Sequence, residues 1–65
     1  MAEDIESMAE LVFRQYGWSA HYFVGDRVQD LNYAGDEAGA AYWRAVGDAV
    51  KAMQAAAKEK YTAKW

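Results

Sequence analysis

The chain has no cysteine and no proline among its 65 residues, and His21 is its only histidine. Without cysteine a disulfide is excluded, and one imidazole without thiols supplies too few ligands for a zinc site. A chain of this length buries only about 60% of the surface that its unfolded form exposes, so it usually needs additional stabilisation. We expect this from self-association, from a compact core of aromatic residues (three Trp, five Tyr and two Phe), or from both.

Long apolar runs are also missing. No stretch approaches the roughly 20 apolar residues that a helix needs to span a membrane. The first residues are acidic, unlike the basic start of a secretory signal or the arginine-rich composition of a transit peptide. We therefore expect a cytoplasmic protein that has no membrane partner.

The residues that are present favour helices. Alanine is abundant and the alternation typical of strands is absent. The sequence predicts an all-α fold, a three-helix protein with two short helices packed on a long C-terminal helix. Residues 1–65 form a single helical domain, with helices at about 4–16, 20–33 and 37–60. Apolar or small residues spaced alternately by four and three place one stripe along the long helix: Gly39, Trp43, Val46, Val50, Met53 and Ala57.

Two glycines mark the expected ends of the shorter helices. Gly17 and Gly35 are suited to the left-handed residue that follows a helix. Asp36 comes directly after Gly35 and is expected to cap the long helix by accepting hydrogen bonds from first-turn amides. The alternative role for Asp36 is an ion pair with Arg27. So short a link is a tight corner of the kind that turns neighbouring helices steeply in helix-turn-helix units.

Two tryptophans are expected to be structural. Trp18 follows Gly17 and can cover Phe13, a contact typical of this helix end. If Ser19 caps the next helix, Trp18 can also pack on Phe23 as a hydrophobic staple. Trp43 is expected to be largely buried in the middle of the long helix. There it would face apolar residues of the shorter helices, such as Val12, Val28 and Leu31.

Three further glycines lie inside predicted helices. Each of them, Gly25, Gly39 and Gly47, destabilises a helix interior by about 1 kcal/mol relative to alanine. We expect another helix to approach closely at these positions.

Catalytic and cofactor sites are not indicated. His21 has no serine or carboxylate at a recognisable catalytic spacing. Asp26 and Asp30 share one helix face, as a glycosidase pair might, but nothing in the sequence signals a pocket beside them. The glycines do not gather into a phosphate-binding loop. The sequence therefore predicts a protein that is not an enzyme and carries no cofactor or metal.

Charge is divided along the chain. Residues 1–37 hold eight acidic and two basic residues, whereas residues 38–65 hold two acidic and five basic ones. The apolar stripe of the long helix continues beyond the length that two short helices of about 20 Å can cover. The uncovered part would form an apolar patch for antiparallel pairing of two copies. The competing account is a frayed monomeric tail. The residues of the expected interface are Met53, Ala57, Tyr61 and Trp65.

The sequence therefore favours a small helical protein-interaction module that self-associates, with a second copy or another protein as its partner. The alternative is a helix-turn-helix-like nucleic-acid-binding regulator. In that case the long helix would present Asp36 and Glu37 first, and phosphates repel such a terminus. Nucleic acid is therefore the less favoured partner.

One pattern extends over roughly residues 9–53. Its sharpest element is A-G-D-x-x-G at residues 34–39, followed by Trp43. This pattern resembles a family of short, uncharacterised bacterial all-helical proteins. The resemblance implies a cytoplasmic helical protein and brings no activity or active site with it. The remaining matching residues are Tyr16, Gly17, Ala20, Arg27, Leu31, Val46, Ala49 and Val50.

Overall fold

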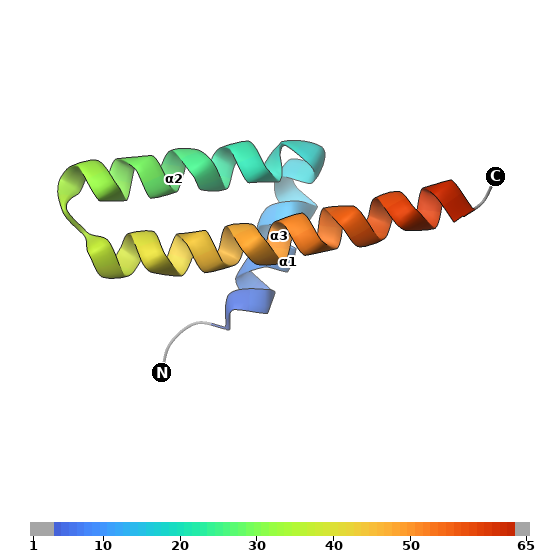
Figure 1. Ribbon diagram of the computed structural model, residues 1–65, viewed down its shortest axis with the longest axis horizontal. Helices are drawn as coiled ribbons and strands as arrows, with labels where there is room; N and C mark the ends of the chain where they lie inside the picture. The colour runs from blue at the N-terminus through green and yellow to red at the C-terminus, as the bar shows by residue number, and fades with distance from the viewer. Residues whose placement is uncertain (1–3, 64–65) are drawn as a thin grey trace.

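A computed structural model of the chain describes the backbone of residues 4–63 and the side chains up to residue 60. The elements are α1 (Ile5–Tyr16), a 3-10 turn η1 (Gly17–Ser19), α2 (Ala20–Ala34) and α3 (Glu37–Ala63). Figure 1 shows their arrangement. The all-α prediction is confirmed for residues 4–63, where the structure contains no strand.

The expectation of three distinct helices is wrong. The 12 residues of α1, three of η1 and 15 of α2 follow one another without a loop, as one bent helical run of 30 residues. α3, with 27 residues, is the second helix. Gly17 bends the run with φ 60° and ψ −130°, so it has the expected positive φ but not the expected left-handed helical conformation. Ser19 stays in the helical region and its side chain makes no cap hydrogen bond, so the predicted cap is not formed.

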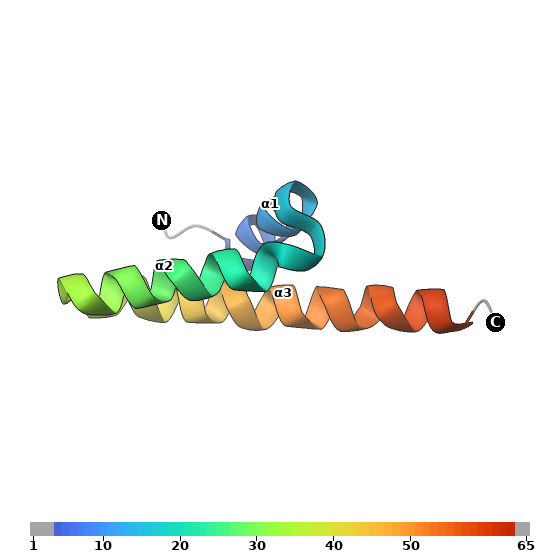
Figure 2. The same ribbon diagram turned by 90° about the horizontal axis from the view of Figure 1, so that it is seen from above.

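The corner at Gly35 differs from expectation. α2 runs back antiparallel beside the first half of α3, whereas α1 crosses the middle of α3 steeply (Figures 1 and 2). The predicted steep corner at Gly35 is therefore a hairpin. Gly35 is left-handed with φ 82°, and the amides of Gly35 and Asp36 donate to the carbonyls of Asn32 and Leu31. These two bonds form a Schellman motif, which closes α2 and returns the chain along it.

The cap of α3 is confirmed. The amide of Gly39 donates to Oδ1 of Asp36 at 2.9 Å. A Cβ at Gly39 would lie 2.6 Å from Oδ2 of Asp36, so this glycine makes room for the capping carboxylate. The prediction that another helix approaches Gly39 is therefore wrong. Asp4 caps α1 in a similar way, accepting from the amide of Glu6 at 3.2 Å.

The other two internal glycines behave differently from each other. A Cβ at Gly47 would lie 3.0 Å from Cγ1 of Val24, which confirms the predicted close approach of α2 and α3 there. A Cβ at Gly25 would meet nothing within 4 Å, so the same prediction for Gly25 is wrong.

The core consists of small aliphatic residues, not of the expected aromatic ones. The two largest fully buried side chains are Val46 and Val50 of α3. Aromatic residues lie around this centre and are only partly buried. Small side chains are needed where helix backbones approach closely, and the larger rings then seal the edges. The remaining buried residues are Ala9, Val12, Ala20, Val24 and Ala40.

Trp43 belongs to this aromatic edge and is half-buried, not largely buried as expected. The edge of its ring meets Phe23 with centroids 6.0 Å apart, and the guanidinium of Arg27 lies 5.4 Å from its centroid. The Arg27 contact is a cation–π interaction. Arg27 therefore contacts the ring of Trp43, in place of the alternative ion pair with Asp36.

Candidate functional site

The molecule offers two concave surfaces among its described residues that bear on function. The first lies where α1 crosses α3 and continues along the C-terminal half of α3. We call it the α1–α3 groove. Its apolar residues are Phe13, Trp18, Met53, Ala56 and Ala57, with Gly17 at one end and Glu10, Arg14 and Lys60 on its rim.

The turn η1 shapes one wall of this groove. Gly17 directs Trp18 back over Phe13, and the two rings meet edge to face with centroids 5.7 Å apart. This confirms the predicted covering of Phe13. The predicted staple of Trp18 on Phe23 gives way to a different contact, because Phe23 stacks on Tyr16 at 4.5 Å. Trp18 itself remains 51% exposed at the mouth of the groove.

Gln54 ties this wall to α3. Its side-chain amide lies 3.4 Å from the carbonyl oxygens of both Gly17 and Trp18. Those carbonyls belong to the bend, and the carbonyl of Gly17 also accepts from the backbone amide of Ala20. The Gln54 amide therefore adds a side-chain donor from α3 to the backbone of η1. Sequence reasoning missed Gln54. Its only sequence signal is a polar residue next to the apolar stripe of α3, which does not reveal a contact 36 or 37 residues away.

The predicted interface residues are only partly visible. Met53 and Ala57 both line the α1–α3 groove, and both are half-buried by α1 rather than exposed together as expected. The side chain of Tyr61 and all of Trp65 lie outside the described residues. The structure therefore brings two of the four predicted residues to one surface.

The second half of α3 has a free face beside the groove. We call residues 51–63 the α3 overhang, because α3 continues there past the junction of α1 and α2 (Figure 1). Three alanines of this segment are exposed: Ala52, Ala55 and Ala56. The overhang also carries Lys51, Lys58 and Lys60 against Glu59. Conversely, α1 with its cap carries Asp4, Glu6 and Glu10 against Arg14.

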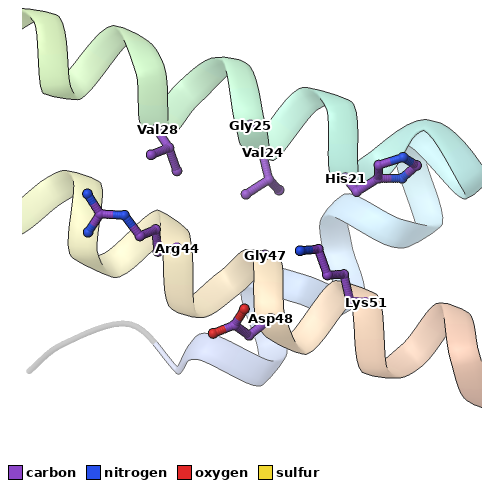
Figure 3. Close-up of a pocket in the computed structure, with 8 residues that line it drawn as sticks. All are labelled: His21, Val24, Gly25, Val28, Arg44, Gly47, Asp48 and Lys51. Atoms are coloured by element: carbon purple, nitrogen blue, oxygen red, sulfur yellow. The ribbon is translucent and has the colours of Figure 1, made fainter.

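The second concave surface lies between α2 and the first half of α3 (Figure 3). This α2–α3 cavity has a volume of about 350 Å³. Its apolar part is formed by Val24 and Val28 of α2 together with Gly25 and Gly47. Four polar residues complete its lining: His21, Arg44, Asp48 and Lys51.

The polar residues of the α2–α3 cavity are spread along it. Lys51 extends its ammonium group toward α2, and Arg44 lies at the opposite end, where its guanidinium is 3.4 Å from Oδ1 of Asn32 (Figure 3). Nδ1 of His21 is buried and has no hydrogen-bond partner. This cavity was not predicted from the sequence, because it depends on how α2 and α3 align side by side.

The remaining residues singled out from the sequence have structural surroundings. Gly35 closes α2 and Asp36 caps α3. Asp26 and Asp30 are both exposed on α2. Among the described residues, no group of three or more His, Asp or Glu side chains could hold a metal ion. In the same part of the chain, no helix is both long and apolar enough to cross a membrane.

Comparisons with protein-family models, with curated proteins and with solved structures find no match to this chain. The resemblance to a bacterial helical family therefore stays a prediction from the residues that carry it. The candidate sites rest on the geometry of the chain itself.

Proposed function

We propose that this protein is a self-associating helical interaction module. In this proposal the α3 overhang of each copy binds in the α1–α3 groove of the other copy. The observation that carries the proposal is the extension of α3 beyond the helices of its own chain, with an apolar groove along one side of it and exposed alanines on another.

The lengths of the helices indicate that part of α3 has no helix of its own chain packed along it. The 27 residues of α3 extend about 40 Å, and the 15 residues of α2 extend about 22 Å. α2 can therefore accompany little more than half of α3. Isolated helices shorter than about 12–15 residues are marginal in water, and most helices in proteins are stabilised by packing. The overhang, at 13 residues, would gain that packing from a second copy.

Charge supports the choice of a second copy as the partner. An antiparallel arrangement brings the lysines of one overhang toward α1 of the other chain, where acidic residues predominate. The same contact is made twice, because a two-fold axis relates the two chains. The exposed alanines allow the two α3 helices to approach closely, and the groove accepts the larger side chains. Complementary charge would set the antiparallel orientation and speed the encounter.

Size-exclusion chromatography with light scattering tests the proposal. Ala56 is exposed and lines the groove, so Ala56→Glu should leave the monomer folded but prevent pairing. Ala41→Glu is the matched control, since Ala41 is exposed on α3 far from the groove. We expect a dimer for the unmodified chain and for Ala41→Glu, and a monomer for Ala56→Glu. A monomeric unmodified chain at high micromolar concentration would overturn the proposal.

Truncation after Ala57 separates pairing from the competing account of a frayed tail. It removes the last turns of the overhang together with Lys58 and Lys60. A dimer built as proposed should weaken or dissociate, which lowers the mass measured by light scattering. A frayed tail should leave both the mass and the melting temperature unchanged.

The nucleic-acid alternative gains no support from the corner at Gly35, where it was expected. A helix-turn-helix unit places its two helices at a steep angle, whereas α2 and α3 lie antiparallel (Figure 2). Asp36 caps α3 and Glu37 begins it, so two acidic residues stand at the end that would approach phosphates. We therefore propose protein as the partner.

A further inference from the structure

The geometry points to a second, independent role for this fold: the α2–α3 cavity binds a small aromatic monocarboxylate. The aromatic body lies between the two helices, over Val24 and Val28, and the carboxylate lies at the ammonium group of Lys51. This inference uses no residue that lines the α1–α3 groove. Lys51 is the first residue of the α3 overhang, but its ammonium group points toward α2 and away from the groove (Figure 3).

The apolar part of the cavity suits a flat body. Glycine destabilises a helix interior relative to alanine, so each helical glycine requires a structural reason. At Gly47 the reason is contact with Val24. At Gly25 a Cβ would meet nothing within 4 Å beyond its chain neighbours and the backbone of its own helical turns. Gly25 instead borders the cavity. Its missing side chain keeps open a space that a ring can enter, with the valines beneath it.

The charges of the cavity favour one anionic group. Two basic residues, Arg44 and Lys51, stand against one carboxylate, Asp48. Within the described side chains neither Lys51 nor Asp48 has an ion-pair partner, whereas Arg44 is engaged with Asn32. Lys51 is thus the cation that remains available, and it points into the space between the helices (Figure 3).

The spacing of the two cations argues against a ligand with two charges. Arg44 and Lys51 are seven residues apart, or about 10.5 Å along the helix. Their cationic groups also lie at opposite ends of the cavity, with Arg44 directed to Asn32, so one carboxylate does not meet both (Figure 3). Asp48 lies between them on α3, where it would repel a second negative group. A volume of about 350 Å³ is at the small end of the range for ligand pockets. These observations together select a small monoanion with an aromatic body.

An NMR titration of the full chain with 2-naphthoate tests the inference, with neutral 2-naphthamide as the matched probe. We expect saturable shifts of the Gly25 and Gly47 amide signals with 2-naphthoate and at least several-fold weaker binding of 2-naphthamide. Lys51→Gln should weaken 2-naphthoate binding about three- to tenfold, as expected for loss of a charge-assisted contact. Lys58→Gln, which removes the same charge outside the cavity, should leave it unchanged.

Gly25→Leu fills the cavity and favours the helix, so it should abolish binding without loss of melting temperature. A Gly25→Leu variant that still binds 2-naphthoate would overturn the inference. The same holds if no saturable shift is seen, if 2-naphthamide binds equally well, if Lys51→Gln and Lys58→Gln behave alike, or if the shifts centre on the Trp18 and Met53 signals.

Discussion

The two halves of α3 are one continuous helix with different surroundings. The first half, residues 37–50, is flanked by α2 and crossed by α1, and it contains three fully buried residues, Ala40, Val46 and Val50. The overhang contains none among its described side chains, and it contacts its own chain through the side that faces α1 and η1, with Lys51 beside α2. Both halves are rich in alanine, but only the first half contains glycines, Gly39 and Gly47, so intrinsic helix propensity favours the overhang and does not explain the burial of the first half.

The difference between the two halves of α3 suggests separate roles, one in the stability of a single copy and one in contact with a partner. The first half has the buried core, which accounts for the stability of a single copy. The overhang adds little to that core yet continues for several turns, with lysines and exposed alanines. Because the overhang contributes little to the core of its own chain, it is the part of α3 best suited to contact another chain. The following substitutions test this division in the first half of α3, which we call the covered half, and in α2 beside it.

The largest effect is expected for Trp43→Ala. The ring of Trp43 contacts Phe23 and the guanidinium of Arg27, but it is only half-buried. We expect a loss of about 3 kcal/mol in the free energy of unfolding, the lower end for truncation of a tryptophan. Arg27→Gln removes the cation alone and should cost about 0.5–1 kcal/mol. Urea denaturation measures both losses in the free energy of unfolding. A loss below about 1 kcal/mol for Trp43→Ala would show that packing around the covered half does not account for the stability of a single copy.

A smaller effect is expected at the start of the covered half. Asp36→Ala removes the acceptor for the Gly39 amide and should cost about 0.5–2 kcal/mol. Asp36→Asn keeps an acceptor oxygen and should cost much less. Thermal unfolding of the two variants, compared with the unmodified chain, separates hydrogen bonding from charge. Equal losses would mean that the charge of Asp36, and not its hydrogen bond, stabilises α3.

The smallest effects concern two glycines on facing helices, with opposite signs. Gly47→Ala would place a Cβ 3.0 Å from Val24, whose branched side chain adjusts poorly within a helix, so we expect a net loss of up to about 1 kcal/mol. Gly25→Ala meets open space and should gain about 0.5–1 kcal/mol. Chemical denaturation of both variants checks the signs. A gain at Gly47 would show that the two helices are less tightly apposed than described.

Local features were the ones that the sequence predicted well. The positive φ of Gly17 and Gly35, the cap by Asp36 and the contact of Trp18 with Phe13 all involve residues within a few positions of one another. Such features follow from the chemistry of one turn. The all-α class also follows from composition and from the period of the apolar residues.

Features that depend on how helices meet could not be predicted in the same way. Periodicity identifies the face of a helix that is buried, but not how far its neighbour covers it, so Trp43 was expected to be deeper than it is. The angle between α2 and α3 depends on the backbone of a single turn, so the steep corner expected at Gly35 is a hairpin instead. The spare volume at Gly25 and the bond from Gln54 to η1 arise only when distant segments are placed together.

Amide hydrogen exchange along α3 tests the division of this helix most directly. At high micromolar concentration, the unmodified chain and Ala41→Glu should both show protected amides through the overhang. Ala56→Glu should lose protection in residues 52–60 while residues 40–50 keep theirs, because only the overhang depends on a second copy. Equal protection of the overhang in all three proteins would contradict the account, since α3 would then be stable to its end within a single chain.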